Sequence, residues 1–164
     1  MLRDHKPSSI VSHPLMSWDI AGGFYWDVMA LGPKIHDVKK LKSLAIKFGW
    51  VDIAWRKELQ TSYDALVLTD ADQIIDWVNP GFKKMTGYPS AYAIGRSPAF
   101  LQGEETSRKS MLQIKKGLDS GSRFEETVTN YRKNGELYQC HLLVIPIQNK
   151  NEVTSHYLAL ETEV

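Results

Sequence analysis

The chain has little of what several classes of protein require. Its 164 residues include a single cysteine, Cys140, so it can form no internal disulfide and no cysteine-rich metal site. The 20 basic and 19 acidic residues nearly cancel, which gives no electrostatic reason to expect nucleic acid or an anionic membrane as a partner. No stretch approaches the ~18 consecutive apolar residues of a membrane span, and the start lacks the apolar run of a secretory signal. These absences predict a cytoplasmic protein in a reducing compartment.

Patterns for catalysis and for metal binding are also absent. The sequence shows no Ser/His/Asp order around a nucleophile and no glycine-rich phosphate loop. The histidines have no ligand-like spacing supported by other donor residues. They are His5, His13, His36, His141 and His156. We therefore predict no enzymatic activity and no metal site.

The spacing of apolar residues changes near residue 63. Residues 1–13 carry Pro7 and three serines and are typical of a disordered lead. Helical spacing then predicts one helix over 17–31 and a second over 33–48, with Gly49 just past its end and a connector beyond. From residue 63 the spacing is that of strands. We predict a helical extension and connector over 14–62 and one domain over 63–164.

The C-terminal domain is predicted to be α+β. Apolar runs between turn residues predict strands at 65–70, 74–79, 124–131, 136–148 and 152–161. Helices are predicted at 80–86, capped by Asn79, and at 106–119. This order implies one five-stranded antiparallel sheet with short helices over one face. A ligand would lie between that face and the helices.

The residues of this domain resemble a PAS domain. The resemblance rests on LVLTDADQIIDWVNPGFKKMTGYPSAYAIGRSPAFLQGEET, on NYRKNGELY and on a later Pro-Ile pair, which follow one another in the family's order. Within the family the sequence is most similar to the flavin-binding light-oxygen-voltage (LOV) subgroup. Residues 14–20 are similar to the start of short bacterial PAS proteins that carry no output domain. The resemblance implies the PAS fold and a role in signal transduction.

One loop departs from the LOV pattern where the photochemistry takes place. The subgroup reads Gly-Arg-Asn-Cys-Arg-Phe-Leu-Gln, and its cysteine thiol adds to the excited flavin. Here Pro98 stands at the place of that cysteine, and Ala99 replaces the arginine that holds the flavin phosphate. The resemblance therefore implies that the flavin adduct cannot form.

Five residues correspond to the family's ligand pocket. Gln102 and Asn130 match amides that read the polar edge of the flavin, because an amide can donate and accept at once. Ser97 and Cys140 each replace an asparagine, and Glu161 replaces the signalling glutamine. Each buried polar group left without its partner costs ~1–3 kcal/mol, so several such changes could weaken flavin binding about a thousandfold. The candidate pocket is therefore these five residues, with flavin mononucleotide disfavoured and no other cofactor expected.

Three functions stay open. The first is a sensor that binds a small apolar or mixed-polarity ligand and signals to the N-terminal helices by a population shift. The second is a protein–protein interaction module with a collapsed pocket and no ligand. The third is a flavoprotein that works without an adduct. We also expect a homodimer through the N-terminal helices and the outer sheet face, and a kinase or regulator on another chain as output partner.

Overall fold

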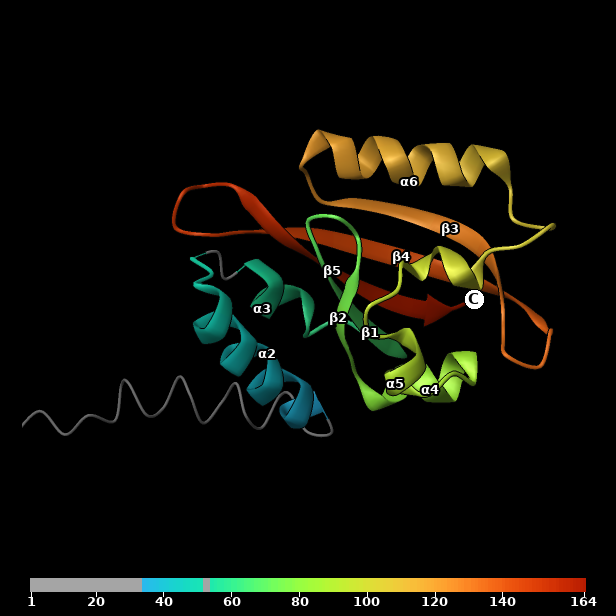
Figure 1. The fold of residues 1–164 in the computed structure, drawn as a ribbon, viewed down its shortest axis with the longest axis horizontal. Coiled ribbons are helices and arrows are strands. Elements are labelled where there is room, and N and C mark those ends of the chain that lie inside the picture. Colours follow the sequence, from blue (N-terminus) through green and yellow to red (C-terminus); the bar gives the residue numbers. More distant parts are fainter. Residues whose placement is uncertain (1–33, 52–53) are drawn as a thin grey trace, which may run out of the picture. The chain divides into compact units, whose positions relative to one another are not determined.

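The computed structural model describes residues 34–51 and 54–164 (Figure 1). The predicted lead over 1–13 and the predicted helix over 17–31 lie outside the described residues. In chain order the elements are helices α2 (Ile35–Phe48) and α3 (Ala54–Glu58), strands β1 (Ala65–Asp70) and β2 (Ile75–Val78), helices α4 (Pro80–Thr86) and α5 (Ser90–Ala93), the 3-10 helix η2 (Pro98–Leu101), helix α6 (Arg108–Ser120), and strands β3 (Phe124–Tyr131), β4 (Leu137–Gln148) and β5 (Thr154–Glu163).

The five strands form one antiparallel sheet in the order β2-β1-β5-β4-β3. The last strand, β5, is its centre: it pairs with β1 from Ala65↔Glu161 to Asp70↔His156 and with β4 on its other side. Figure 1 shows β5, in red, running between the two. The predicted α+β fold is confirmed. Because β5 touches both halves of the sheet, a change at β5 reaches strands that are far apart in sequence.

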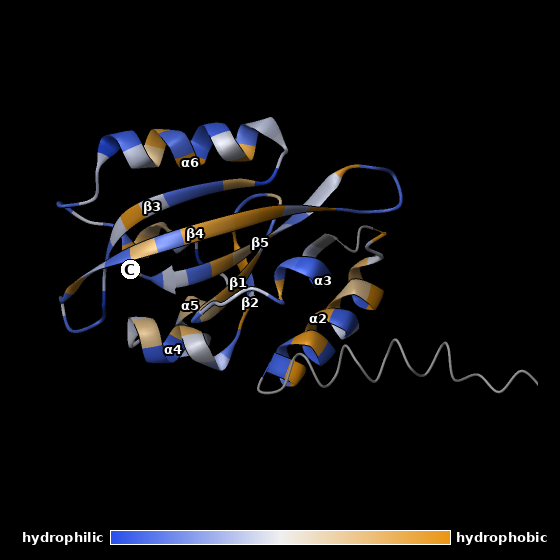
Figure 2. Cartoon of the chain, turned by 180° about the vertical axis from the view of Figure 1, so that it is seen from behind, coloured by the Kyte–Doolittle hydropathy of each residue, from blue (hydrophilic) through white to orange (hydrophobic). Residues whose placement is uncertain are grey.

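One face of the sheet is covered by the short helices and by α6. Successive residues of a strand point to opposite faces, and this face carries Val67 on β1 and Val128 on β3. Both are buried in a core cluster with Phe82 of α4 and Leu101 of η2. Helix α6 runs alongside β3 (Figure 1), and Figure 2 shows hydrophobic central strands beside a helix of mixed hydropathy. This face is where a ligand was expected.

Helices α2 and α3 pack on the opposite face. Leu66 and Leu68 of β1 pair there with Leu160 and Leu158 of β5, and all four are buried. The helices supply further buried apolar side chains, namely Leu41, Trp55 and Leu59. The sheet is therefore covered on both faces, and α2 ends at Gly49 in the left-handed conformation, as its position predicted. No helix in the described ranges is long and apolar enough to cross a membrane.

A buried polar network fixes α2 to the sheet. The Asp37 carboxylate of α2 accepts hydrogen bonds from the Tyr63 hydroxyl at 3.1 Å and from the Asn79 amide at 2.9 Å. The side-chain oxygen of Asn79 accepts in turn from the backbone N–H groups of Leu66 and Phe82. Burial, together with the negative charge of Asp37, raises the pKa of Tyr63 above its ordinary value. Asn79 therefore caps α4, as predicted, and also joins β1 to α2.

Candidate ligand-binding cavity

A cavity of about 130 Å³ lies between the helices η2 and α6 and the face of the sheet that carries Val67 and Val128. Strands β1, β3, β4 and β5 form its floor, and the two helices contribute the opposite wall. Most of its lining is aliphatic, including Val67, Leu101, Leu118, Val128, Leu142 and Val144. Such walls suit a flat apolar group.

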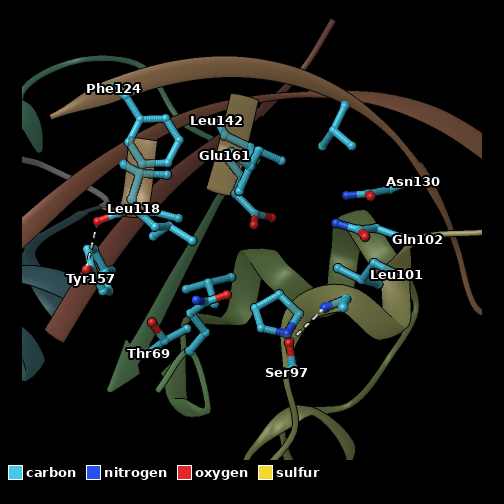
Figure 3. Close-up of a pocket in the computed structure, with 18 residues that line it drawn as sticks. Thr69, Ser97, Leu101, Gln102, Leu118, Phe124, Asn130, Leu142, Tyr157 and Glu161 are labelled. Carbon is cyan, nitrogen blue, oxygen red and sulfur yellow. Dashed lines mark hydrogen bonds between the residues drawn. The ribbon is translucent and has the colours of Figure 1, made fainter. Parts of the chain in front are cut away.

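Three of the polar side chains that line this cavity, those of Glu161, Asn130 and Gln102, are labelled in Figure 3. Glu161 of β5 and Asn130 of β3 are only 4% and 5% exposed, and Glu161 Oε2 and Asn130 Oδ1 have no hydrogen-bond partner among the described residues. Figure 3 shows the Glu161 carboxyl pointing into the cavity and the amides of Asn130 and Gln102 side by side. Burial raises the pKa of Glu161 from 4.5 to about 7. The cavity wall therefore carries two buried acceptor atoms that have no donor among the described residues.

The structure places four of the five candidate residues at the cavity: Ser97, Gln102, Asn130 and Glu161. Ser97 stands before η2, where its Oγ accepts from the backbone N–H of Ala99 at 3.4 Å, so it serves as a cap at the rim.

Cys140 does not line the cavity, contrary to its assignment to the pocket. It points to the same side of β4 as Leu142, but it is fully buried in the core cluster beside its strand partner Val128. Burial raises the pKa of its thiol. A cysteine side chain is short, so at this position it fills the core without reaching the cavity.

Three polar cavity residues were missed by the sequence analysis: Thr69, Gln73 and Tyr157. The Tyr157 hydroxyl donates to the backbone oxygen of Leu118 at 3.2 Å, which joins β5 to α6. Gln73 lies in the β1–β2 turn with a positive φ of 63°. The two-residue alternation of strands places Tyr157 on the face of Glu161 and Thr69 on that of Val67, so this signal would have found two of the three.

Comparison with protein families matches residues 64–163 to the PAS domain. The chain belongs to the PAS domain family. Blue-light-activated histidine kinase 2 of Erythrobacter litoralis is 31% identical over 111 residues, which cover 68% of this chain and 32% of the kinase. A blue-light photoreceptor of Listeria innocua is 34% identical over 99 residues, which cover 58% of this chain and 39% of the photoreceptor. This PAS chain thus spans less than half the length of these relatives.

Solved structures agree with this assignment. The LOV domain of an Erythrobacter litoralis blue-light activated histidine kinase is 30% identical, with a TM-score of 0.59, covering 63% of this chain and 97% of that domain. The dark structure of the Aureochrome1 LOV domain is 27% identical, with a TM-score of 0.65, covering 69% of this chain and 84% of that one. The resemblance to the LOV subgroup is confirmed.

The residues of the cavity do not fit flavin mononucleotide. Its volume of about 130 Å³ is close to that of an engineered cavity of ~150 Å³ that holds a single benzene ring, whereas flavin has three fused rings. Ala99 offers no charge to a phosphate, and no lysine or arginine is among the described residues that line the cavity. The only thiol of the chain, that of Cys140, lies outside it. The LOV fold is therefore present here with a different pocket.

Proposed function

We propose that this PAS domain is a sensory module that binds a small molecule of about one ring between the sheet and the helices. The observation that carries this proposal is the pair of buried acceptors on Glu161 and Asn130, both facing a cavity and both without a donor. A buried polar atom left without a partner costs ~1–3 kcal/mol. A ligand that supplies the missing donors removes this cost, so the cavity is more stable with such a ligand bound than when it is empty.

Strand β5 offers a route by which the domain could report an occupied cavity. Glu161 faces the cavity, whereas its neighbour Leu160 faces the side of the sheet covered by α2 and α3. The Glu161 backbone oxygen accepts from the Asp64 N–H at 2.8 Å, at the start of β1. Strand β1 is joined to α2 through the Asn79–Asp37 hydrogen bond. A ligand shifts the position of the helices only if it binds more tightly to one arrangement of helices and sheet than to another.

Two other functions make different predictions. A ligand-free interaction module requires a collapsed pocket, and the cavity of about 130 Å³ favours the sensor over it. A flavoprotein without an adduct requires a coloured protein. None of the three assigns a chemical step to this chain, so we propose no enzymatic activity.

An absorption spectrum of the freshly purified protein, followed by mass spectrometry of molecules released on denaturation, separates these functions. We expect a colourless protein that releases a one-ring compound. A visible flavin band would contradict our interpretation of the pocket. A colourless protein that releases nothing, and whose melting temperature no small aromatic compound raises, would favour the interaction module.

We further infer a homodimer through the N-terminal helices, which cover the outer sheet face, with a cytoplasmic kinase or regulator as output partner. Support comes from exposed apolar side chains at the end of α2, just after it, and in the β4–β5 turn. These are Ile46, Val51 and Val153, which are 85%, 52% and 58% exposed. Light scattering over a broad concentration range tests the dimer, and a monomer mass throughout would contradict it.

A further inference from the structure

We propose that the ligand of this cavity carries a planar, positively charged nitrogen group of the amidine type, and that the Glu161 carboxylate is its anchor. The proposal rests on the sensory function proposed above and names the chemical class of the ligand. It follows from three features of the site: an unpaired charge, the kind of atoms left without partners, and the shape of the walls.

Glu161 has no positively charged partner among the residues that the structure describes. It is the only charged residue among the 18 that line the cavity (Figure 3). Tyr138 and Cys140 of β4, on which the charge of Glu161 acts, are both neutral near pH 7, because burial raises the pKa of each. Asp64 and Glu163, whose charges also act on Cys140, are acidic and cannot neutralise it.

Arg132, a cation beside Tyr138, already pairs with other carboxylates. Its guanidinium lies 4.5 Å from the ring centre of Tyr138 and is bonded to Glu163 at 2.5 Å, with Glu136 at 3.6 Å. It also donates to the backbone oxygen of Met85. The side chain of Arg132 is thus held at the β3–β4 turn, outside the cavity lining. No described residue that lines the cavity supplies a positive charge to Glu161, and we infer that the ligand supplies it.

The unpartnered atoms also define which edge the ligand presents. Glu161 Oε2 and Asn130 Oδ1 face the cavity and accept hydrogen bonds, whereas the third such atom among the described residues, the hydroxyl of Tyr138 opposite Asn130, lies outside the lining. Above about pH 7 the Glu161 carboxylate is ionised and has no hydrogen to donate. A ligand with a carbonyl-rich edge would face oxygen with oxygen. A ligand with N–H groups satisfies both atoms, and a planar fork of two N–H groups matches a carboxylate with two parallel hydrogen bonds.

The walls favour a delocalised cation over a compact ammonium. Leu142, the strand partner of Glu161, and Leu101 and Val144 give the cavity aliphatic surface, which cannot replace the water lost by a strongly hydrated ion. A planar, delocalised cation is more weakly hydrated and is less costly to bury. The volume of about 130 Å³ accommodates one aromatic ring. Benzamidine, a six-membered ring with an amidinium group, is therefore a suitable probe.

Isothermal titration calorimetry near pH 8 on the full chain tests the proposal with three probes of one shape: benzamidine, neutral benzamide and anionic benzoate. We expect benzamidine to bind about tenfold or more tightly than benzamide, with benzoate weakest, because hydrogen bonds to a charged group are worth ~1.5–3 kcal/mol. The benzamidine affinity should fall as the pH is lowered through 7, since protonation removes the charge of Glu161.

Glu161→Gln should weaken benzamidine binding about 10- to 100-fold and leave benzamide binding within about threefold. The matched control is Glu163→Gln, which removes the same charge two residues along β5 from a carboxylate that faces Arg132 outside the cavity. It should change benzamidine binding by less than about twofold, as expected for a partly exposed charge.

The wild-type protein alone can overturn the proposal. If benzamide binds as tightly as benzamidine, the inferred cation is wrong while the small-ligand cavity stands. If none of the three probes binds, both the inferred cationic ligand and the proposed one-ring ligand are wrong. If benzamidine binds equally well to the wild-type and Glu161→Gln proteins, its site is elsewhere and the assignment of Glu161 is wrong.

Discussion

Replacing Glu161 with glutamine should alter how the stability of the domain depends on pH. Burial raises the pKa of Glu161 from 4.5 to about 7, so the folded chain holds a proton over a range in which the unfolded chain has lost it. The stabilisation from this group is fully present below pH 4.5 and is lost as the pH rises to about 7. At ~1.4 kcal/mol for each pKa unit, the free energy of unfolding falls by about 3 kcal/mol across that range. Glutamine does not titrate, so the variant lacks this loss.

Urea unfolding at half-unit steps between pH 4.5 and 8 measures the effect. The difference in unfolding free energy between Glu161→Gln and wild type should move in favour of the variant by about 3 kcal/mol from pH 4.5 to pH 8. His156, whose pKa is lowered chiefly by burial, is present in both proteins and cancels from the difference. Glu163→Gln is the matched control and should change the free energy of unfolding by less than about 1 kcal/mol, because that residue is partly exposed.

Parallel stability curves for wild type and Glu161→Gln between pH 5 and 8 would refute this reasoning. They would show that the carboxylate ionises in the folded domain at little cost, either because water reaches it or because a cation pairs with it. The second case would also remove the basis for a cationic ligand. A wild type more stable than the variant near pH 8 would contradict the unpaired state of Glu161 directly.

Three further outcomes can be measured. Asp37→Ala leaves the Tyr63 hydroxyl and a buried amide without an acceptor, so it should lower the free energy of unfolding in urea by about 2–3 kcal/mol. Tyr63→Phe should lower it by only about 1 kcal/mol. Equal losses in the two variants would show that no network exists. Gly117→Ala places a methyl group 2.4 Å from the Phe124 ring, so it should destabilise the domain by about 1–2 kcal/mol despite the better helix propensity of alanine; an unchanged urea midpoint would show that β3 and α6 can separate. Cys140 should react with a thiol reagent only in urea, because it is buried and its pKa is raised, and rapid labelling of the native chain would contradict this burial.

The sheet could be predicted from the sequence because its signals are local. The strand predicted at 65–70 is found at those residues, and the helix predicted at 80–86 has the predicted Asn79 cap. The predicted strand over 152–161 begins two residues later and ends at Glu163. Helix α5 and the 3-10 helix η2 were not predicted, since each has only four residues and too few positions to show a period.

The site was harder to predict because it depends on distances between strands. The resemblance to the LOV subgroup assigned both Cys140 and Glu161 to the pocket, and both lie on the same face of the sheet. Alternation along a strand assigns such a face. It cannot say which residues on that face meet a cavity and which meet other side chains. Cys140 packs beside Val128 in the core cluster, whereas Glu161 reaches the cavity. The covering elements η2 and α6 decide this difference, and their positions follow from tertiary packing.

The buried carboxyl of Glu161 links ligand binding to stability. Near pH 8 it lowers the stability of the ligand-free domain by about 3 kcal/mol relative to its protonated state, and a bound cation would offset part of that loss. A ligand that binds only the folded chain stabilises it by RT ln(1 + [L]/Kd), where [L] is the free ligand concentration. A cationic ligand should therefore raise the melting temperature more at pH 8 than at pH 5, whereas a neutral ligand of equal size should not distinguish the two. The fold alone cannot tell a cationic ligand from a neutral one, because the LOV relatives have the same sheet. The difference lies at one position, since the resemblance places a neutral glutamine where this chain has Glu161.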